Sequence, residues 1–264
     1  MVSSYGYERL EIGRVLSRAF SAIGQNFAVM FGLALLLGVI PLGAAIFGLG
    51  ALGAATDGAE PFEMFNYFGV TAIALIALSV TVLVLTHAAL TPVVIAHAEH
   101  RKARFGEALR DSLSMLVPLV GLALVMGTLV GIGLMVLTGP GLFLYVSWTV
   151  ATPAMVRERL GIRAALARSW ELVDEERWKI LAIVLLLCAG YLVIVFGSTF
   201  LAVFVMAASG NAATTAAVVV QSALSLISYA LIEMIWASTL TALYVELVET
   251  KEGGTTNALE QVFA

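Results

Sequence analysis

Glu233 and His87 are the ionisable residues placed deepest within apolar stretches, and both could do chemistry there. Glu233 lies near the middle of the apolar run 216–245. An ionised carboxylate at the centre of a bilayer costs roughly 2.5–3.5 kcal/mol, so it must face protein or water, find a partner or take up a proton. Tyr229, four residues earlier, and Trp236, three residues later, extend a polar stripe along the same helical face.

His87 precedes Thr91-Pro92 by about one helical turn. Two interpretations stay open. The imidazole either pairs with Glu233, or remains neutral and bonds to a backbone carbonyl left open near Pro92. For Glu233 the alternatives are a contact with an ion, proton or substrate, and a structural hydrogen bond that locks helices together.

Further catalytic chemistry is not indicated. The sequence has no GxSxG, Walker A or HExxH motif, and Cys188 is its sole cysteine. His97, Glu99 and His100 lie close together, but a structural zinc site needs four ligands, commonly cysteines. We therefore expect no enzymatic activity, no cofactor and no metal. The basic residues form no tract typical of nucleic-acid binding, so we expect no nucleic-acid partner.

The elements that carry these residues are transmembrane helices. The 264 residues are 61% hydrophobic and 12% charged, with a mean hydropathy of +1.00, whereas soluble domains carry about 25% charged residues. A span needs about 20 residues. Uncharged runs, divided by Gly/Pro/Asn turns, predict an all-α protein of six spans at 27–50, 68–96, 115–138, 141–157, 179–207 and 216–246.

The distribution of charge predicts the orientation. All 14 Lys and Arg residues lie in residues 1–26, 97–111, 157–179 or the C-terminal tail, and none lies in the loops 51–67, 138–141 and 208–215. Basic segments face the cytoplasm. We expect a bacterial inner-membrane protein with both termini in the cytoplasm.

Each pair of spans follows an amphipathic segment, at 12–23, 105–116 and 162–173. Such helices lie in the membrane interface. The three segments share one spacing of apolar residues, which predicts three hairpins, each preceded by an interfacial helix. The chain is then a single transmembrane domain, 1–264, with internal repeats near 10–99, 103–158 and 160–250.

Several interface residues could contact lipid. Basic side chains near the membrane surface attract anionic head groups, and Trp anchors at the interface. We expect head-group contacts from Arg14, Arg18, Arg110 and Arg168, and anchoring by Trp170 and Trp178. In the third span, Gly127 and Gly131 form a GxxxG pattern that predicts close helix packing.

Residues 147–187 resemble a known family. Trp148, Pro153, Glu158 and Trp178 frame the segment Ala165-Leu166-Ala167-Arg168-Ser169-Trp170-Glu171-Leu172. This pattern is similar to that of the membrane-domain family named after bacterial glycerophosphoryl diester phosphodiesterases. The resemblance implies a stand-alone membrane domain without the separate catalytic barrel of the namesake enzymes.

Function is predicted from these features together. The amphipathic segments and basic interface residues favour a non-enzymatic membrane protein that binds lipids or organises a protein partner or homo-oligomer. The alternative is a small transporter or channel that uses Glu233 and His87 in a central cavity. A lipid-acting enzyme is a third interpretation, with the same two residues as its candidates.

Overall fold

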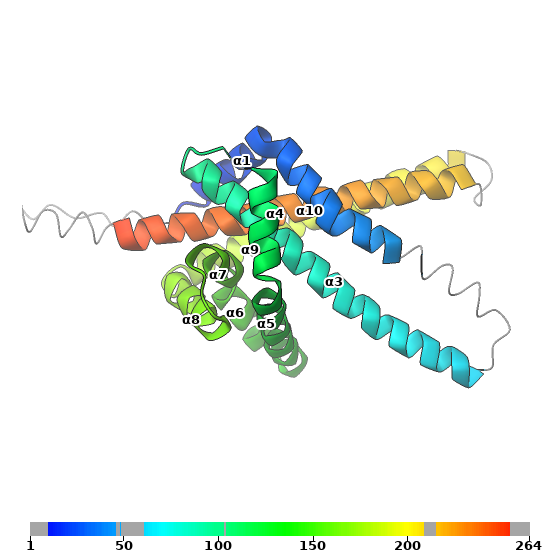
Figure 1. Ribbon diagram of the computed structural model, residues 1–264, viewed down its shortest axis with the longest axis horizontal. Coiled ribbons are helices and arrows are strands. Elements are labelled where there is room, and N and C mark those ends of the chain that lie inside the picture. The colour runs from blue at the N-terminus through cyan, green and yellow to red at the C-terminus, as the bar shows by residue number, and fades with distance from the viewer. Residues whose placement is uncertain (1–9, 46–47, 49–60, 103, 209–214, 254–264) are drawn as a thin grey trace, which may run out of the picture.

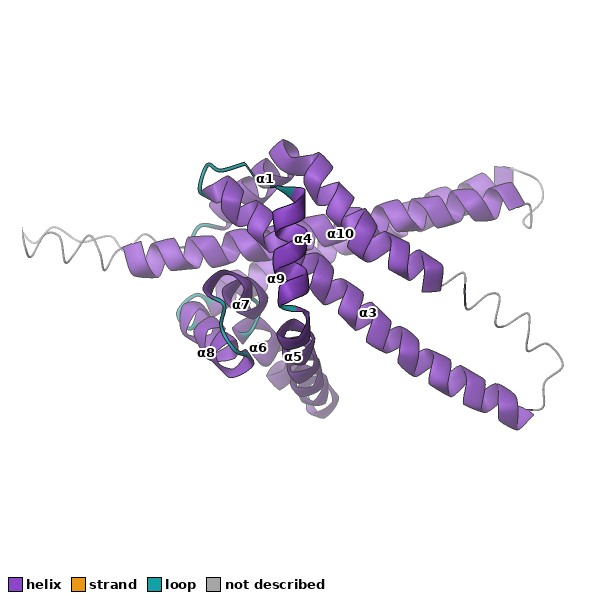
Figure 2. Ribbon diagram, in the orientation of Figure 1, coloured by secondary structure: helices purple, strands orange, loops and turns teal. Residues whose placement is uncertain are grey.

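A computed structural model describes residues 10–45, 48, 61–102, 104–208 and 215–253. All elements in these ranges are helices (Figures 1 and 2). Five of them are long and apolar enough to cross a bilayer: Ile12–Ala45, Gly69–Ala98, Leu116–Val136, Arg177–Val205 and Val220–Glu252. The prediction of an all-α, multi-pass membrane protein is therefore confirmed.

The first helix contains the predicted interfacial segment 12–23 and continues into the predicted first span, 27–50. Helix α1 (Ile12–Leu33) has non-helical dihedral angles at Asn26, whose side chain donates to the carbonyl of Ala22. Beyond that kink the chain continues into the π-helix η1 (Ala34–Val39). Pro41 follows η1 and has no N–H to donate to the preceding turn, which accounts for the altered hydrogen-bond spacing there.

Helices α3 (Pro61–Ala98), α4 (Phe105–Ser114) and α5 (Leu116–Val136) follow. Met115, with φ −107° and ψ 11°, separates the amphipathic α4 from the apolar α5. The predicted loop 51–67 is described from Pro61 onward, where α3 begins, and its earlier part lies outside the described residues. The end of the predicted first span and the turn 209–214 also lie outside them.

The prediction of a single fourth span over 141–157 was wrong in its local structure. Two short helices occupy this region, α6 (Thr138–Ser147) and α7 (Ala151–Glu158), with a break at Trp148–Val150. Pro153 falls in the first turn of α7, where its missing N–H costs nothing. The predicted turn at 138–141 is shorter than expected, because Leu137 alone is extended between α5 and α6.

The remaining helices are α8 (Ile162–Val173), α9 (Arg177–Ala208), α10 (Thr215–Val248) and the π-helical η2 (Glu249–Gly253). Helix α10 is central and packs against α1, α3 and α9. In its most apolar window 56% of the residues are buried, against 17–28% for the other four candidate spans. The helices converge where α1, α4, α7 and α8 gather around α10, and α3 diverges from α10 towards the opposite end (Figure 1).

The three amphipathic segments are helical as predicted, and they bury small residues at equivalent positions. Their buried residues include Val15 and Ala19 in α1, Ala108 and Ser112 in α4, and Ala165 and Ser169 in α8. The large residue of each predicted apolar face points outward instead: Phe20, Leu113 and Trp170 are all exposed. The internal repeat itself stays a prediction.

The predicted close packing at Gly127 and Gly131 was wrong, since a Cβ atom at either residue would meet nothing within 4 Å. The close approach lies two residues further on, at Gly133. A Cβ on Gly133 would lie 2.8 Å from the Cα of Gly141, and one on Gly141 would lie 2.4 Å from the backbone nitrogen of Leu134. These two glycines allow the tight reversal between α5 and α6.

Gly141→Ala should therefore destabilise the protein, because its methyl group would collide with backbone that cannot move aside. Overpacking of this kind costs about 1–3 kcal/mol. Gly127→Ala is the matched control and should leave the melting temperature unchanged or raise it, because its site is open. Thermal denaturation in detergent, followed by circular dichroism, compares the two. Equal melting temperatures would show that the α5–α6 contact is looser than described.

Candidate functional site

Two recesses contain the predicted functional residues. The first, here called the intramembrane cavity, has a volume of about 550 Å³ and lies among α3, α5, α6, α9 and α10. Both His87 and Glu233 line it, together with aromatic, hydroxyl and apolar side chains. The other lining residues are Leu83, Val84, Ala123, Met126, Tyr145, Thr149, Thr152, Cys188, Tyr191, Ile232, Trp236 and Leu240.

His87 and Glu233 meet across α3 and α10. The Nε2 atom of His87 lies 2.8 Å from Oε2 of Glu233, and the Glu233 side chain is 7% exposed. The two atoms are in close contact, but their orientation is not that of an aligned hydrogen bond. The structure thus selects the pairing with Glu233 for the imidazole. The backbone carbonyl of His87 accepts a hydrogen bond from the Thr91 hydroxyl instead.

The helices that carry this pair are joined again one turn further along α3 and about two turns further along α10. The hydroxyl oxygens of Thr91 on α3 and Thr241 on α10 lie 3.3 Å apart in the core. Each hydroxyl also lies within hydrogen-bonding distance of a carbonyl four residues earlier in its own helix. This contact fixes the register of α3 against α10 and so holds His87 opposite Glu233.

Tyr229 does not line the intramembrane cavity. Its ring packs towards η1, where a Cβ on Gly38 would lie 3.0 Å from the ring and 3.4 Å from the hydroxyl of Thr86. The predicted stripe along α10 is therefore split between two sides of the helix. Trp236, which the same stripe contains, does reach the cavity.

The second recess, here called the basic groove, has a volume of about 930 Å³ between α1 and the end of α3. Its cationic lining comprises Arg14, Arg18, Arg101 and Lys102, joined by the imidazoles of His97 and His100. Glu11 is the acidic residue in the lining, and Ser17, Ser21, Gln25 and Asn26 supply polar side chains. His97 Nε2 lies 3.2 Å from the Ser21 hydroxyl and so connects the two walls.

Two of the predicted head-group arginines also bind α10. Arg14 Nε lies 2.7 Å from Oε1 of Glu246, and Arg18 Nη2 lies 3.5 Å from Oε2 of the same carboxylate and 2.8 Å from Glu249. The Glu246 side chain is only 3% exposed. A carboxylate buried this far needs such partners, so these arginines have a structural role.

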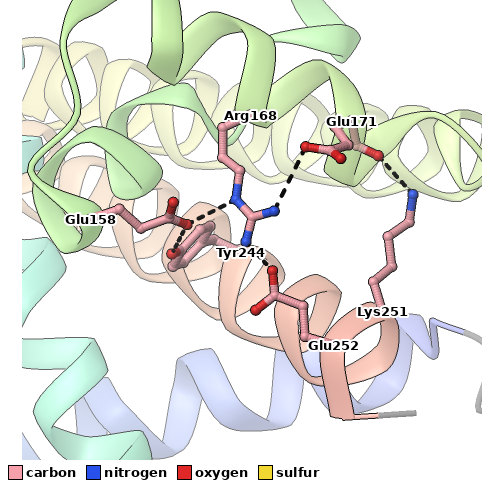
Figure 3. Close-up of polar contacts among 6 residues, drawn as sticks. All are labelled: Glu158, Arg168, Glu171, Tyr244, Lys251 and Glu252. Atoms are coloured by element: carbon pink, nitrogen blue, oxygen red, sulfur yellow. Dashed lines mark hydrogen bonds and ion pairs between the residues drawn. The ribbon is translucent and has the colours of Figure 1, made fainter. Parts of the chain in front are cut away.

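Arg168 forms a second cluster on the other side of α10 (Figure 3). Oε1 of Glu158 accepts hydrogen bonds from Arg168 Nε at 3.0 Å and from the Tyr244 hydroxyl at 2.7 Å, and Arg168 also pairs with Glu252. Burial works against the charged guanidinium, but the hydrogen bonds to Glu252 and Glu158 outweigh it and raise the pKa of Arg168 above its ordinary value. Arg168 thus ties α8 to α7 and to η2, which continues α10.

The end of α3 and the start of α4 carry further ion pairs. Arg101 Nε donates to Glu99 at 2.9 Å, and Arg157 also pairs with Glu99. The hydrogen bond from Arg101, opposed by partial burial and assisted by the charge of Arg157, lowers the pKa of the Glu99 carboxyl. Arg110 is exposed and forms no ion pair with any residue of the described ranges.

The two predicted anchor tryptophans differ. Trp170 packs edge-on against Phe143, at 5.5 Å between ring centroids, and the Arg177 guanidinium lies 4.9 Å from its ring centre. Trp178 is 83% exposed and has an unobstructed outward face. Within the described ranges no group of three His, Cys, Asp or Glu residues is placed to hold a metal ion.

Sequence reasoning missed the acidic partners of the arginines. Glu246 binds Arg14 and Arg18, Glu158 binds Arg168, and the Tyr244 hydroxyl donates to Glu158. Nothing in the local pattern around Glu246 or Tyr244 distinguishes them from surface residues. One signal was available for Glu246. It directly follows the last apolar run, 216–245, on the helical face that also carries Ala242 and Leu243.

Glu246→Gln should destabilise the protein, because it leaves Arg14 and Arg18 facing a neutral amide in a nearly buried position. Hydrogen bonds to charged groups contribute about 1.5–3 kcal/mol, and the melting temperature should fall accordingly. Glu249→Gln is the control: this more exposed carboxylate pairs with Arg18 alone and should cost under about 1 kcal/mol. Equal losses from the two variants in thermal denaturation would contradict the importance of burial at Glu246.

Comparison of the chain with protein-family models, curated proteins and solved structures returned no match. The resemblance carried by residues 147–187 therefore stays a prediction. The functional argument rests on the two recesses and on the residues that line them.

Proposed function

We propose that this protein is a non-enzymatic bacterial inner-membrane protein that binds anionic lipids at its cytoplasmic face. The basic groove is the observation that carries the proposal. It combines four cationic side chains with one acidic residue, at the end of the bundle where the Lys and Arg residues gather. Each basic residue near a membrane surface contributes about 1 kcal/mol to the attraction of anionic lipid.

The groove contains cationic hydrogen-bond donors that are not used by its own ion pairs. Nη1 of Arg18 is buried and has no hydrogen-bond acceptor among the described residues. Lys102 is exposed beside it in the lining and forms no ion pair within those ranges. A lipid phosphate would attract the exposed lysine, and such charge-assisted bonds are stronger than neutral ones.

The amphipathic helices support a position of the groove at the membrane surface. Phe20, Leu113 and Trp170 occupy equivalent positions and are exposed, although Trp170 also packs against Phe143, while the small residues beside them pack inward. Helices of this kind insert an apolar side into the boundary between head groups and acyl chains. A lipid bound in the groove would then keep its chains in the adjoining leaflet.

We further propose six crossings with both termini in the cytoplasm, the fourth crossing being made by α6 and α7 together. The positions of the Lys and Arg residues support this arrangement, because they alternate between segments as an even number of crossings requires. The 21 residues from Thr138 to Glu158 would extend about 30 Å if collinear. Membership of the family that residues 147–187 resemble is part of the same proposal.

Site-directed labelling tests the fourth crossing. In a Cys188→Ser background, single cysteines replace Gly139 and Gly161, two exposed positions with open space around them that flank α6 and α7. A membrane-impermeant maleimide should label the first from outside intact cells or spheroplasts and the second from the cytoplasmic side in inverted vesicles. Labelling of both from one side would show that α6 and α7 turn back without crossing.

Native mass spectrometry of the protein extracted gently from its membrane tests the function. We expect phospholipid to co-purify, and added phosphatidylglycerol to bind more tightly than phosphatidylcholine. The double variant Arg101→Ala/Lys102→Ala should lower this affinity about thirtyfold, since each of the two charges contributes about 1 kcal/mol.

The control removes two exposed arginines that lie outside the groove, Arg159 and Arg163. Removing this pair changes the charge by the same amount as the test variant and should leave the affinity for phosphatidylglycerol almost unchanged. An equal loss from both variants would mean diffuse attraction to the membrane and would overturn the proposed site. A stoichiometric protein partner without lipid would instead indicate an organising role. If the protein carried neither lipid nor a partner, the proposal as a whole would be contradicted.

A further inference from the structure

The intramembrane cavity has a chemistry that differs from that of the basic groove. The two share no lining residue. Glu233 brings a carboxylate into the cavity wall, and no Lys or Arg lines the cavity. An anionic ligand would therefore meet repulsion and find no strong cationic partner, so lipid phosphate is excluded as its occupant.

We propose that the intramembrane cavity binds a lipophilic organic cation, an amine or quaternary onium group on an apolar body. The carboxylate of Glu233 supplies the counter-charge. It is nearly buried, so its attraction for a cation is screened less than that of an exposed carboxylate. His87 is its present partner, and a bound cation takes over part of that role.

Aromatic side chains complete the site for such a ligand. Trp236 lies one turn along α10 from Glu233, Tyr145 comes from α6 and Tyr191 from α9. The faces of Trp and Tyr rings attract cations, and a desolvated contact of this kind contributes about 2 kcal/mol. The combination of three rings with one acid favours an organic cation over a metal ion, which would require several oxygen ligands.

The size and opening of the cavity fit a ligand that arrives through the membrane. Its volume of about 550 Å³ lies within the range of sites for small organic molecules, about 300–1,000 Å³. Leu83, Cys188 and Tyr191 line the cavity and are also exposed on the outer surface of α3 and α9. Eleven residues of helix, about 16 Å, separate His87 from the end of α3 at Ala98. The entrance thus faces the acyl chains of the bilayer.

Calorimetric titration of the whole protein in detergent with tetraphenylphosphonium tests the proposal. We expect saturable binding with one site per chain. Triphenylphosphine oxide, which has three of the same aryl groups but no net charge, should bind at least about tenfold more weakly. Equal binding of the two probes would show a merely apolar recess and would overturn the assignment.

Substitutions then locate the site. Glu233→Gln should weaken tetraphenylphosphonium binding at least about tenfold, whereas His87→Gln should leave it unchanged or strengthen it, because it removes the competing partner. Glu246→Gln, a carboxylate change on the same helix outside the cavity, should bind as the parent does. Equal loss from Glu233→Gln and His87→Gln would show that the pair is only structural.

A variant at the cavity entrance keeps the test decisive if Glu233→Gln does not fold. Tyr191→Ala changes a residue that is 45% exposed, so its effect on stability should be small. It should weaken the binding of the cation about threefold or more and leave phosphatidylglycerol binding unchanged. Cation binding unaffected by Tyr191→Ala would place the ligand elsewhere. Because the lipid assay concerns the basic groove alone, either proposal can fail without the other.

Discussion

The bilayer imposes one constraint on which the rest of the structure depends: a carboxylate that is buried away from water needs a polar or charged partner beside it. Helix α10 carries two nearly buried carboxylates, Glu233 and Glu246. The first pairs with His87 on α3 and the second with Arg14 and Arg18 on α1. Breaking a buried pair is far costlier than the pair's net contribution, so these contacts specify which helices surround α10 and in what register.

Residues around and beyond Glu246 extend the same principle to the end of the helix. Tyr244 and Glu252 bind the Glu158–Arg168 pair, and Lys251 donates to the backbone carbonyl of Glu171. Both α1 and α8 are thereby fastened to the same end of α10, on different sides. The arginines expected from sequence to hold lipid phosphate are partly occupied with this task. A lipid that binds the basic groove must share Arg14 and Arg18 with Glu246, which makes Lys102 the freer cation.

The helices could be predicted from sequence because each depends on local properties. Uncharged runs indicate spans, and the amphipathic spacing at 12–23, 105–116 and 162–173 indicates surface helices. The charge pairs could not be predicted, because Arg18 and Glu249 are 231 residues apart and only the fold brings them together. The GxxxG pattern at Gly127 and Gly131 misled for a related reason, since small residues permit a close approach but do not cause one.

The failure at the fourth predicted span has a different cause, and it coincides with the intramembrane cavity. Tyr145, Thr149 and Thr152 line the cavity, and they come from α6, from the break and from α7 respectively. Irregular backbone is tolerated at membrane depth where protein covers it, and Thr149 and Val150 are buried. A continuous helix would also carry residues 145, 149 and 152 on one face, so lining the cavity does not by itself explain why the helix is interrupted at Trp148. Departures from local regularity tend to occur at functional sites. The broken segment is therefore itself an argument that the cavity beside Glu233 is a built feature of this protein.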